Sequence, residues 1–290
     1  MTIWSDYTWV WGLEITTFHA PPSPTLDRDA QNALIPSSYP DTNVRFDSGN
    51  FSKLINCVIH HNYQSSSFGQ PSENSEWYGN IVVANGRRGK DNDSGNAIYS
   101  QNRNGTKRLT DNIVANNFLV GINCYSGGQA YDSNYEIDGN ICFGNGHSQI
   151  QPQRNILLGA SFPSENIVVR SNILYNFTVD RANAFLGYGG PMLNSVIEGN
   201  LSLNGGLILH ENIGSMRVVG NELVGGELSV RWPDIAATWS YLFESNKYAR
   251  VNFNPWLYDD AGAYHSRSEE HTSELQSHSD LVCRLLLEKK

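Results

Sequence analysis

The chain has 290 residues, of which 39% are hydrophobic and 17% charged, and its formal net charge is −9 at pH 7. Such an acidic chain lacks the basic surface that nucleic acids and anionic membranes bind, and no apolar run is long enough to span a bilayer as a helix. The four cysteines do not form close-spaced pairs, so neither a zinc site nor a disulfide framework is predicted.

A short unit centred on asparagine recurs down the chain. It reads Gly-Asn-Ile-Val-Val-Ala-Asn at residues 79–85, and related copies start at positions 111, 139, 171 and 199. With the fainter copies included, the leading asparagines stand at positions 56, 80, 112, 140, 172, 200, 221 and 246. A unit repeated at this period is typical of a solenoid. The steps between copies vary, which favours short strands joined by loops of unequal length over helical repeats.

Each copy is flanked by short runs rich in Ile, Val, Leu and aromatic residues. In one coil, residues 107–110 lead into 113–114 and then into 121–125. Runs of this length, bounded by Gly, Asn or Asp, are typical of strands, and no stretch shows a sustained, capped helical period. The sequence therefore predicts an all-β fold, a parallel β-helix of about eight to nine coils with three short strands per coil.

The recurring asparagine has a physical reason to stand at a corner between strands. Asn tolerates the left-handed backbone conformation that a tight corner needs, and stacked asparagines can hydrogen-bond from coil to coil as a ladder. The alternative is that Asn and Gly only mark loops. In this alignment Cys57 matches Ile81, which is taken as an inward position, so we expect a buried Cys57.

This pattern resembles the right-handed parallel β-helix superfamily with the pectate-lyase-like fold, over residues 2–255. The resemblance implies a polysaccharide partner, an extracellular or periplasmic location and, for the lyases, a monomer. The superfamily includes polysaccharide lyases, glycoside hydrolases, epimerases and adhesins.

Both ends of the chain depart from the repeat. Residues 267–277 resemble the translation of a common sequencing adapter, so we expect residues 266–290 to be a non-native tail and residues 1–265 to form the β-helix domain. An amphipathic capping helix is the alternative for the tail. The first residues already read as a strand, without a signal peptide or an atypical cap, which predicts an internal fragment truncated at both ends.

The loop at residues 86–96 concentrates charge between two strands. It holds Arg88 and Lys90 together with Asp91 and Asp93. Such a loop could supply a lyase with a base and a charge neutraliser, and the two aspartates could hold calcium, which prefers oxygen ligands. The alternative is a solvated turn with internal ion pairs.

Alternation along the strands predicts an outward row. If Ile98 and Ser100 face inward, their neighbours face outward. Aromatic faces stack on sugar rings and amides bond to hydroxyl groups, so this row is a candidate polysaccharide site, with an ordinary exposed strand surface as the alternative. The predicted substrate-binding residues are Tyr99, Gln101, Asn123, Tyr125 and Tyr188, and the row continues to His210 and Arg231.

The leading functional hypothesis is an extracellular polysaccharide-active protein that cleaves a uronate polymer by β-elimination. Lys90 or His210 would act as the base, and Arg88 and Arg231 would neutralise the uronate carboxylate. Polygalacturonase-type motifs and a convincing pectate-lyase calcium motif are absent, and a glycoside hydrolase is less favoured. The alternative is a non-catalytic glycan-binding module, an adhesin or a spike-like surface protein.

Overall fold

The computed structural model describes residues 1–16, 44–62, 64–86, 95–146, 154–177, 182–190, 192–209, 216–232, 241–258 and 264–266. Within these ranges all regular secondary structure is β-strand, which confirms the all-β prediction. Side chains at positions 230–232, 241–243, 253–258 and 264–266 lie outside the description.

The strands form three long sheets, A, B and C, which the chain visits in turn. Sheet A contains β1 (Thr2–Ile3), β4 (Arg45–Phe46), β7 (Ser66–Phe68), β10 (Ile98–Ser100), β13 (Ile122–Ser126), β16 (Ile156–Ala160), β20 (Ala182–Tyr188), β24 (Gly206–Leu209), β27 (Glu227–Trp232), β30 (Asn252–Tyr258) and β31 (Tyr264–Ser266). Sheet B contains β2 (Trp9–Trp11), β5 (Lys53–Ile55), β8 (Glu76–Tyr78), β11 (Lys107–Thr110), β14 (Tyr135–Asp138), β18 (Ile167–Arg170), β22 (Ser195–Glu198), β25 (Met216–Val219) and β28 (Tyr241–Glu244). Sheet C contains β3 (Glu14–Ile15), β6 (Val58–His60), β9 (Ile81–Val83), β12 (Ile113–Ala115), β15 (Ile141–Phe143), β19 (Ile173–Tyr175), β23 (Leu201–Leu203), β26 (Glu222–Val224) and β29 (Lys247–Ala249).

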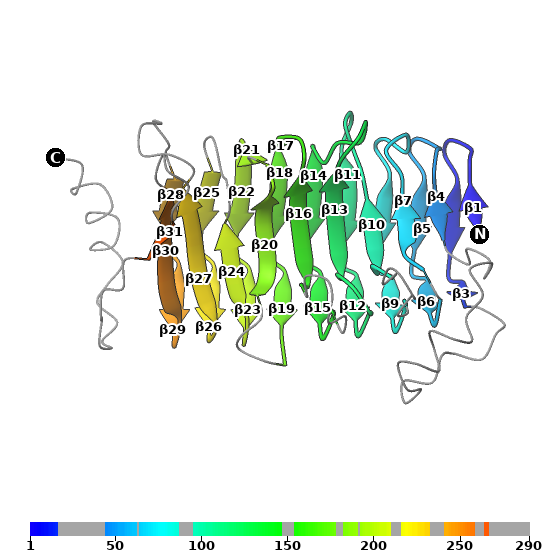
Figure 1. Cartoon of the computed structure of the whole chain (residues 1–290). Helices are drawn as coiled ribbons and strands as arrows, with labels where there is room; N and C mark the ends of the chain where they lie inside the picture. Colours follow the sequence, from blue (N-terminus) through cyan, green and yellow to red (C-terminus); the bar gives the residue numbers. More distant parts are fainter. Residues whose placement is uncertain are drawn as a thin grey trace, which may run out of the picture.

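Each strand pairs in parallel with its equivalent one coil further on, so the described chain is a parallel β-helix with three strands per coil. Figure 1 shows the coils stacked along one axis from β1 to β30. The exceptions are a small side sheet of β17 (Ser164–Glu165) and β21 (Met192–Leu193), and the antiparallel pair of β30 and β31. Within the described ranges, sheets B and C each contain nine strands, which confirms the prediction of about eight to nine coils.

The interior is built from rows of equivalent side chains, one from each coil. On sheet B, Trp77, Leu109 and Ile137 are fully buried and stand in register on adjacent strands. Near the N-terminal end, Phe46 and Phe68 pack against Trp77 with ring centroids 5.8 Å and 5.5 Å from the indole. Burial of these rows against one another stabilises the stack, because no single coil has a core of its own.

The asparagine ladder is present at the corner between sheets B and C. Each Nδ2 donates to a backbone carbonyl one coil back at 2.7–2.9 Å and, in every member but the last, to the Oδ1 of the next ladder asparagine at 2.9–3.0 Å. The members are Asn80, Asn112, Asn140, Asn172, Asn200, Asn221 and Asn246. These bonds satisfy backbone groups that the corner removes from the sheets.

A second ladder runs along the corner between sheets C and A. Its Nδ2 to Oδ1 distances are 2.8–3.0 Å, and its members are Asn62, Asn85, Asn117, Asn145, Asn155 and Asn183. In the copies of the repeated unit that start at positions 79 and 139, the final asparagine, Asn85 or Asn145, belongs to this ladder. Only the leading asparagine of the unit was predicted to form a ladder, although the copies at 79–85 and 139–145 contain a member of each ladder.

Two details of the predicted corner are wrong. The left-handed residue precedes the ladder asparagine, as at Gly79 with φ 65° and Asp111 with φ 54°. In the first copy this position belongs to Asn56, with φ 50°, and Cys57 takes the ladder position, where its backbone N–H donates to Oδ1 of Asn80 at 2.9 Å. Asn56 is therefore not a ladder member.

The predicted match of Cys57 with Ile81 is also displaced by one residue. Val58 is the residue that pairs with Ile81, and the Ile81 side chain faces outward, with 39% of its surface exposed. Cys57 is nevertheless fully buried, as predicted. A shift of one residue reverses every side chain of a strand, so an alignment by residue type alone could not fix the inward face.

Candidate functional site

Several predicted site residues lie outside the described residues. Arg88, Lys90, Asp91, Asp93 and His210 belong to this group, so their roles stay predictions. Arg231 lies in β27, in register with Trp256 of β30, and its side chain is likewise outside the description.

The two ends of the charged loop are described, and they meet. A Cβ on Gly95 would lie 1.9 Å from Cα of Gly86, so the backbones of these two glycines are in contact. Beside this point, Asn123 donates from Nδ2 to Oδ1 of Asn96 at 3.4 Å. The loop that carries Arg88 and Lys90 therefore departs next to the predicted outward row.

The first part of that row forms a compact polar and aromatic group on the outer face of sheet A. Ile98 and Ser100 are fully buried, and Tyr99 between them faces outward, as alternation predicts. Nε2 of Gln101 donates to the Tyr99 hydroxyl at 3.2 Å, and the rings of Tyr99 and Tyr125 lie 6.3 Å apart. Burial raises the pKa of Tyr99, Tyr125 adds to the shift and Gln101 opposes it. The phenol therefore stays neutral and can donate a hydrogen bond at neutral pH.

A second line of residues crosses three coils beside this group. Tyr125 pairs with Gly159, and Gly159 pairs with Tyr188, whose side chain is 39% exposed. Gly159 has φ 125°, and a Cβ there would lie 2.4 Å from the backbone nitrogen of Tyr188, so only glycine fits. The two tyrosines thus stand two coil steps apart, roughly 9.6 Å, with no side chain between them.

The predicted row is not continuous, because its other positions are covered. Tyr99 is in register with Asn123, and the row then passes to Leu157 and Phe185. These last three side chains are 5–8% exposed, and the Arg154 guanidinium lies 5.5 Å from the Phe185 ring centroid. The accessible part of the predicted site is therefore Tyr99, Gln101, Tyr125 and Tyr188, and Asn123 contributes little surface.

A buried lysine that was not predicted from the sequence lies at the corner between sheets A and B. Lys107 is fully buried, and its Nζ donates to the carbonyl oxygens of Phe68 at 2.9 Å, Gln101 at 2.6 Å and Gly69. Burial lowers the pKa of Lys107 well below its usual value. A signal was present, because Leu109 stands two residues later and alternation puts both on the inward face. These contacts give Lys107 a structural role beneath the outward row.

A buried carboxyl group lies one coil further on. Asp132 pairs with Asn102 in an isolated bridge, is fully buried, and accepts a hydrogen bond from the Ser164 hydroxyl at 2.7 Å. Burial raises the pKa of Asp132 to about 7, although bonds from Ser164 and Ser126 oppose the shift. The side chain has no outward face, so it cannot touch a polymer on the surface.

The first coil carries a second aromatic surface, on the outer face of sheet B. Trp9 and Trp11 are 64% and 68% exposed, and Nζ of Lys53 lies 5.5 Å from the Trp9 ring centroid. Trp11 is in register with Ile55 on the next strand, and Ile55 with Tyr78, whose side chain is 40% exposed. From the sequence these tryptophans were predicted only to be part of a strand, although large aromatics on the outward face of a strand are themselves a binding signal.

Among the described residues, no group of three or more His, Cys, Asp or Glu side chains could hold a metal ion. In the same part of the chain, no helix is long and apolar enough to cross a membrane. No family model matches the chain, and searches of curated proteins and of solved structures find no match. The assignment of the fold therefore depends on the strand topology and the ladders.

Proposed function

We propose that the protein binds an extracellular polysaccharide along the outer face of sheet A. The observation that carries this proposal is the line from Tyr125 to Tyr188 across Gly159. Two tyrosines on strands about 9.6 Å apart match the length of a disaccharide unit, and the missing side chain between them leaves room for a sugar ring.

The neighbouring groups suit the same ligand. Tyrosine rings present a flat apolar face to the C–H groups of a pyranose and a hydroxyl at the edge. Gln101 and Tyr99 add an amide and a neutral phenol beside Tyr125. Because the ladders hold the coils in line, these groups are positioned before the ligand arrives, which lowers the entropic cost of binding.

A second candidate function is β-elimination on a uronate polymer, and the position of the charged loop favours it. The ends of that loop, at Gly86 and Gly95, lie beside Asn96 and Asn123. In this reaction Lys90 as the base takes the proton from C5, the electron pair forms the C4–C5 double bond, the C4–O bond breaks, and the leaving oxygen takes up a proton. Arg88 would neutralise the carboxylate that makes C5 acidic. His210 and Arg231 stay as the further candidates for these two roles, and calcium on Asp91 and Asp93 stays a prediction.

Binding is tested by titrating pectate, alginate and neutral β-linked glycans into the protein in a calorimeter. We expect Tyr125→Ala and Tyr188→Ala each to weaken binding about tenfold, which is about 1.4 kcal/mol. Phe177→Ala, which removes an exposed aromatic that packs against Tyr175 of sheet C, is the control and should bind like the wild type.

Three results would count against this site. If none of the glycans binds, the proposed function is rejected. If both tyrosine variants keep the wild-type affinity, the site is not on the outer face of sheet A. Loss of binding in Trp11→Ala alone would move the site to the first coil. Ultraviolet absorbance of the unsaturated product tests elimination separately, because binding without this signal supports the non-catalytic alternative.

A further inference from the structure

The outer face of sheet C presents a row of exposed apolar side chains, whereas the outer face of sheet B carries ion pairs such as Arg108 with Glu136. Ile81, Ile113, Ile141 and Ile173 stand in direct register on β9, β12, β15 and β19. They are 39%, 37%, 38% and 40% exposed. The alternate residues on these strands, such as Val82 and Val114, are fully buried, so the isoleucines face outward.

A second outward row runs beside the isoleucines and is also without charge. We name the ten outward residues of β9, β12, β15, β19 and β23 the C strip: Ile81, Val83, Ile113, Ala115, Ile141, Phe143, Ile173, Tyr175, Leu201 and Leu203. All except Ala115 are at least partly exposed. Charged groups begin at its two ends, with Glu14 paired to His60 on one side and Glu222 on the other.

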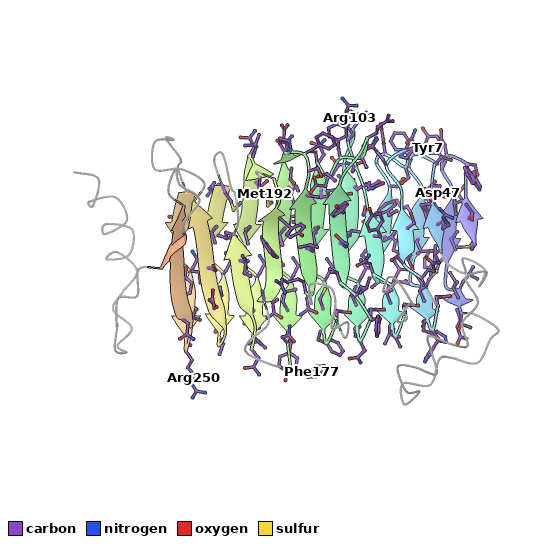
Figure 2. The ribbon with its side chains drawn as sticks, viewed as in Figure 1. Tyr7, Asp47, Arg103, Phe177, Met192 and Arg250 are labelled. Atoms are coloured by element: carbon purple, nitrogen blue, oxygen red, sulfur yellow. The ribbon has the colours of Figure 1, made fainter. Side chains whose placement is uncertain are left out.

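The strip continues past the end of β19. Phe177 is 58% exposed and packs edge-on against Tyr175, with ring centroids 5.4 Å apart. Figure 2 shows Phe177 projecting at the edge of the molecule, beyond the sheet C strands. A contiguous apolar patch of this kind is a mark of an interaction surface, since isolated exposed apolar residues are common but long rows are not.

The chemistry of the strip excludes several occupants. Apart from the Tyr175 hydroxyl it offers no side-chain hydrogen-bonding group, so it is poorly suited to a glycan rich in hydroxyls. It contains no Lys or Arg to attract an anionic lipid surface. The backbone groups of its strands are already paired with neighbouring coils, so it cannot accept an added strand.

We propose that a second copy of this chain packs its own C strip against this one. A row of side chains repeating about every 4.8 Å presents ridges and grooves, and another copy has the same repeat, so the isoleucines of one strip fit between those of the other along its whole length. The net charge of −9 opposes contact elsewhere between two copies, whereas the strip brings together no charges. A two-fold axis makes the contact self-complementary.

The size of the strip indicates how tightly the two copies hold together. Five strands extend roughly 20 Å along the axis, and two strips in contact bury on the order of 1,000 Å² in total, the lower end for a specific interface. The dimer is therefore weak and forms as the protein concentration rises. It differs from the monomer that the sequence resemblance favoured, and it is independent of the proposed glycan site on sheet A.

Sedimentation velocity of the full chain, from micromolar to near-millimolar concentration, tests the proposal. The wild type is expected to shift from monomer to dimer. The double variant Ile113→Lys with Ile141→Lys places like charges in the strip and should weaken the dimer at least tenfold. The matched control is Val168→Lys with Val196→Lys, two register-paired outward valines on sheet B, which should dimerise like the wild type.

A mixing experiment separates loss of the interface from loss of folding. The Lys double variant and a double variant with Ile113→Glu and Ile141→Glu should each stay monomeric, and their mixture should form a heterodimer. A wild type that is monomeric throughout overturns the proposal and leaves the strip to another partner. Equal loss of dimer in the Val168 and Val196 control, or no recovery in the mixture, overturns it as well.

Discussion

Two sets of polar contacts link successive coils, and they differ in burial rather than in geometry. The ladder between sheets B and C has amide contacts of 2.9–3.0 Å, and its asparagines are 0–6% exposed. The outer face of sheet B has ion pairs of similar length, such as Arg108 Nε to Glu136 Oε2 at 2.9 Å, but these side chains are 42% and 36% exposed. Water competes for the second set and cannot reach the first, so the ladder is expected to stabilise the stack far more.

The largest expected effect comes from removing one ladder side chain. In Asn112→Ala, two donated bonds, to Trp77 O and Asn140 Oδ1, and two accepted bonds, from the backbone and side-chain nitrogens of Asn80, disappear. Buried groups on both neighbouring coils are then unpaired, which costs about 3–5 kcal/mol of unfolding free energy. Urea denaturation followed by circular dichroism measures the loss.

An exposed asparagine provides the control for that measurement. Asn104 donates to Glu73 at 3.0 Å on the surface, so Asn104→Ala should change stability by no more than about 0.5 kcal/mol. Equal losses in Asn104→Ala and Asn112→Ala would show that burial does not set the strength of the coil-to-coil contacts.

The sequence predicted the repeating architecture because the relevant signals are local. Alternation within a run such as Lys107-Arg108-Leu109 is visible in the sequence, and the spacing of asparagines marks the corners. The register between coils was not predictable in the same way. Asn56 and Cys57 each stand one position earlier in the coil than expected, because the register depends on which backbone N–H meets Oδ1 of Asn80 one coil away.

In the candidate site, too, features set within one strand were predictable and features set by the register between coils were not. The outward direction of Tyr99 follows from one strand alone. The alignment of Tyr125 with Tyr188 depends on a register shift between Leu158 and Gly159, which no pattern in the sequence marks. Lys107 was missed although alternation placed it inward, because a charged residue is seldom buried unless partners on other coils compensate it.

A buried carboxyl group sharpens the comparison through pH. The folded pKa of Asp132, about 7, lies above its unfolded value of 3.8. Its contribution to stability is therefore complete below about pH 4 and is lost as the pH rises through 7. Asp132→Asn keeps a neutral polar group and cannot titrate. As the pH rises from 4 to 7, the unfolding free energy of the variant should increase relative to that of the wild type by on the order of 2–4 kcal/mol.

Thermal unfolding of both proteins at several pH values measures this difference. The folded pKa of Lys107 is lowered, so its contribution to stability rises with pH, opposite to that of Asp132. Both contributions are present in the wild-type curve, and subtracting the curve of the variant leaves that of Asp132. If the melting temperatures of the two proteins change in parallel between pH 4 and 7, the folded pKa of Asp132 is not raised.

The smallest effect is expected on the outer face of sheet B. Arg108→Ala removes the bond to Glu136, and the loss should lie between 0 and about 1 kcal/mol because both side chains remain hydrated when they separate. The loss should shrink further at high salt, since solvent ions screen an exposed pair, whereas the loss in Asn112→Ala should not depend on salt. Denaturation of both variants at low and high ionic strength measures the two responses. A large, salt-independent loss in Arg108→Ala would mean that the ion pairs and the ladder stabilise the coils in the same way, despite their difference in burial.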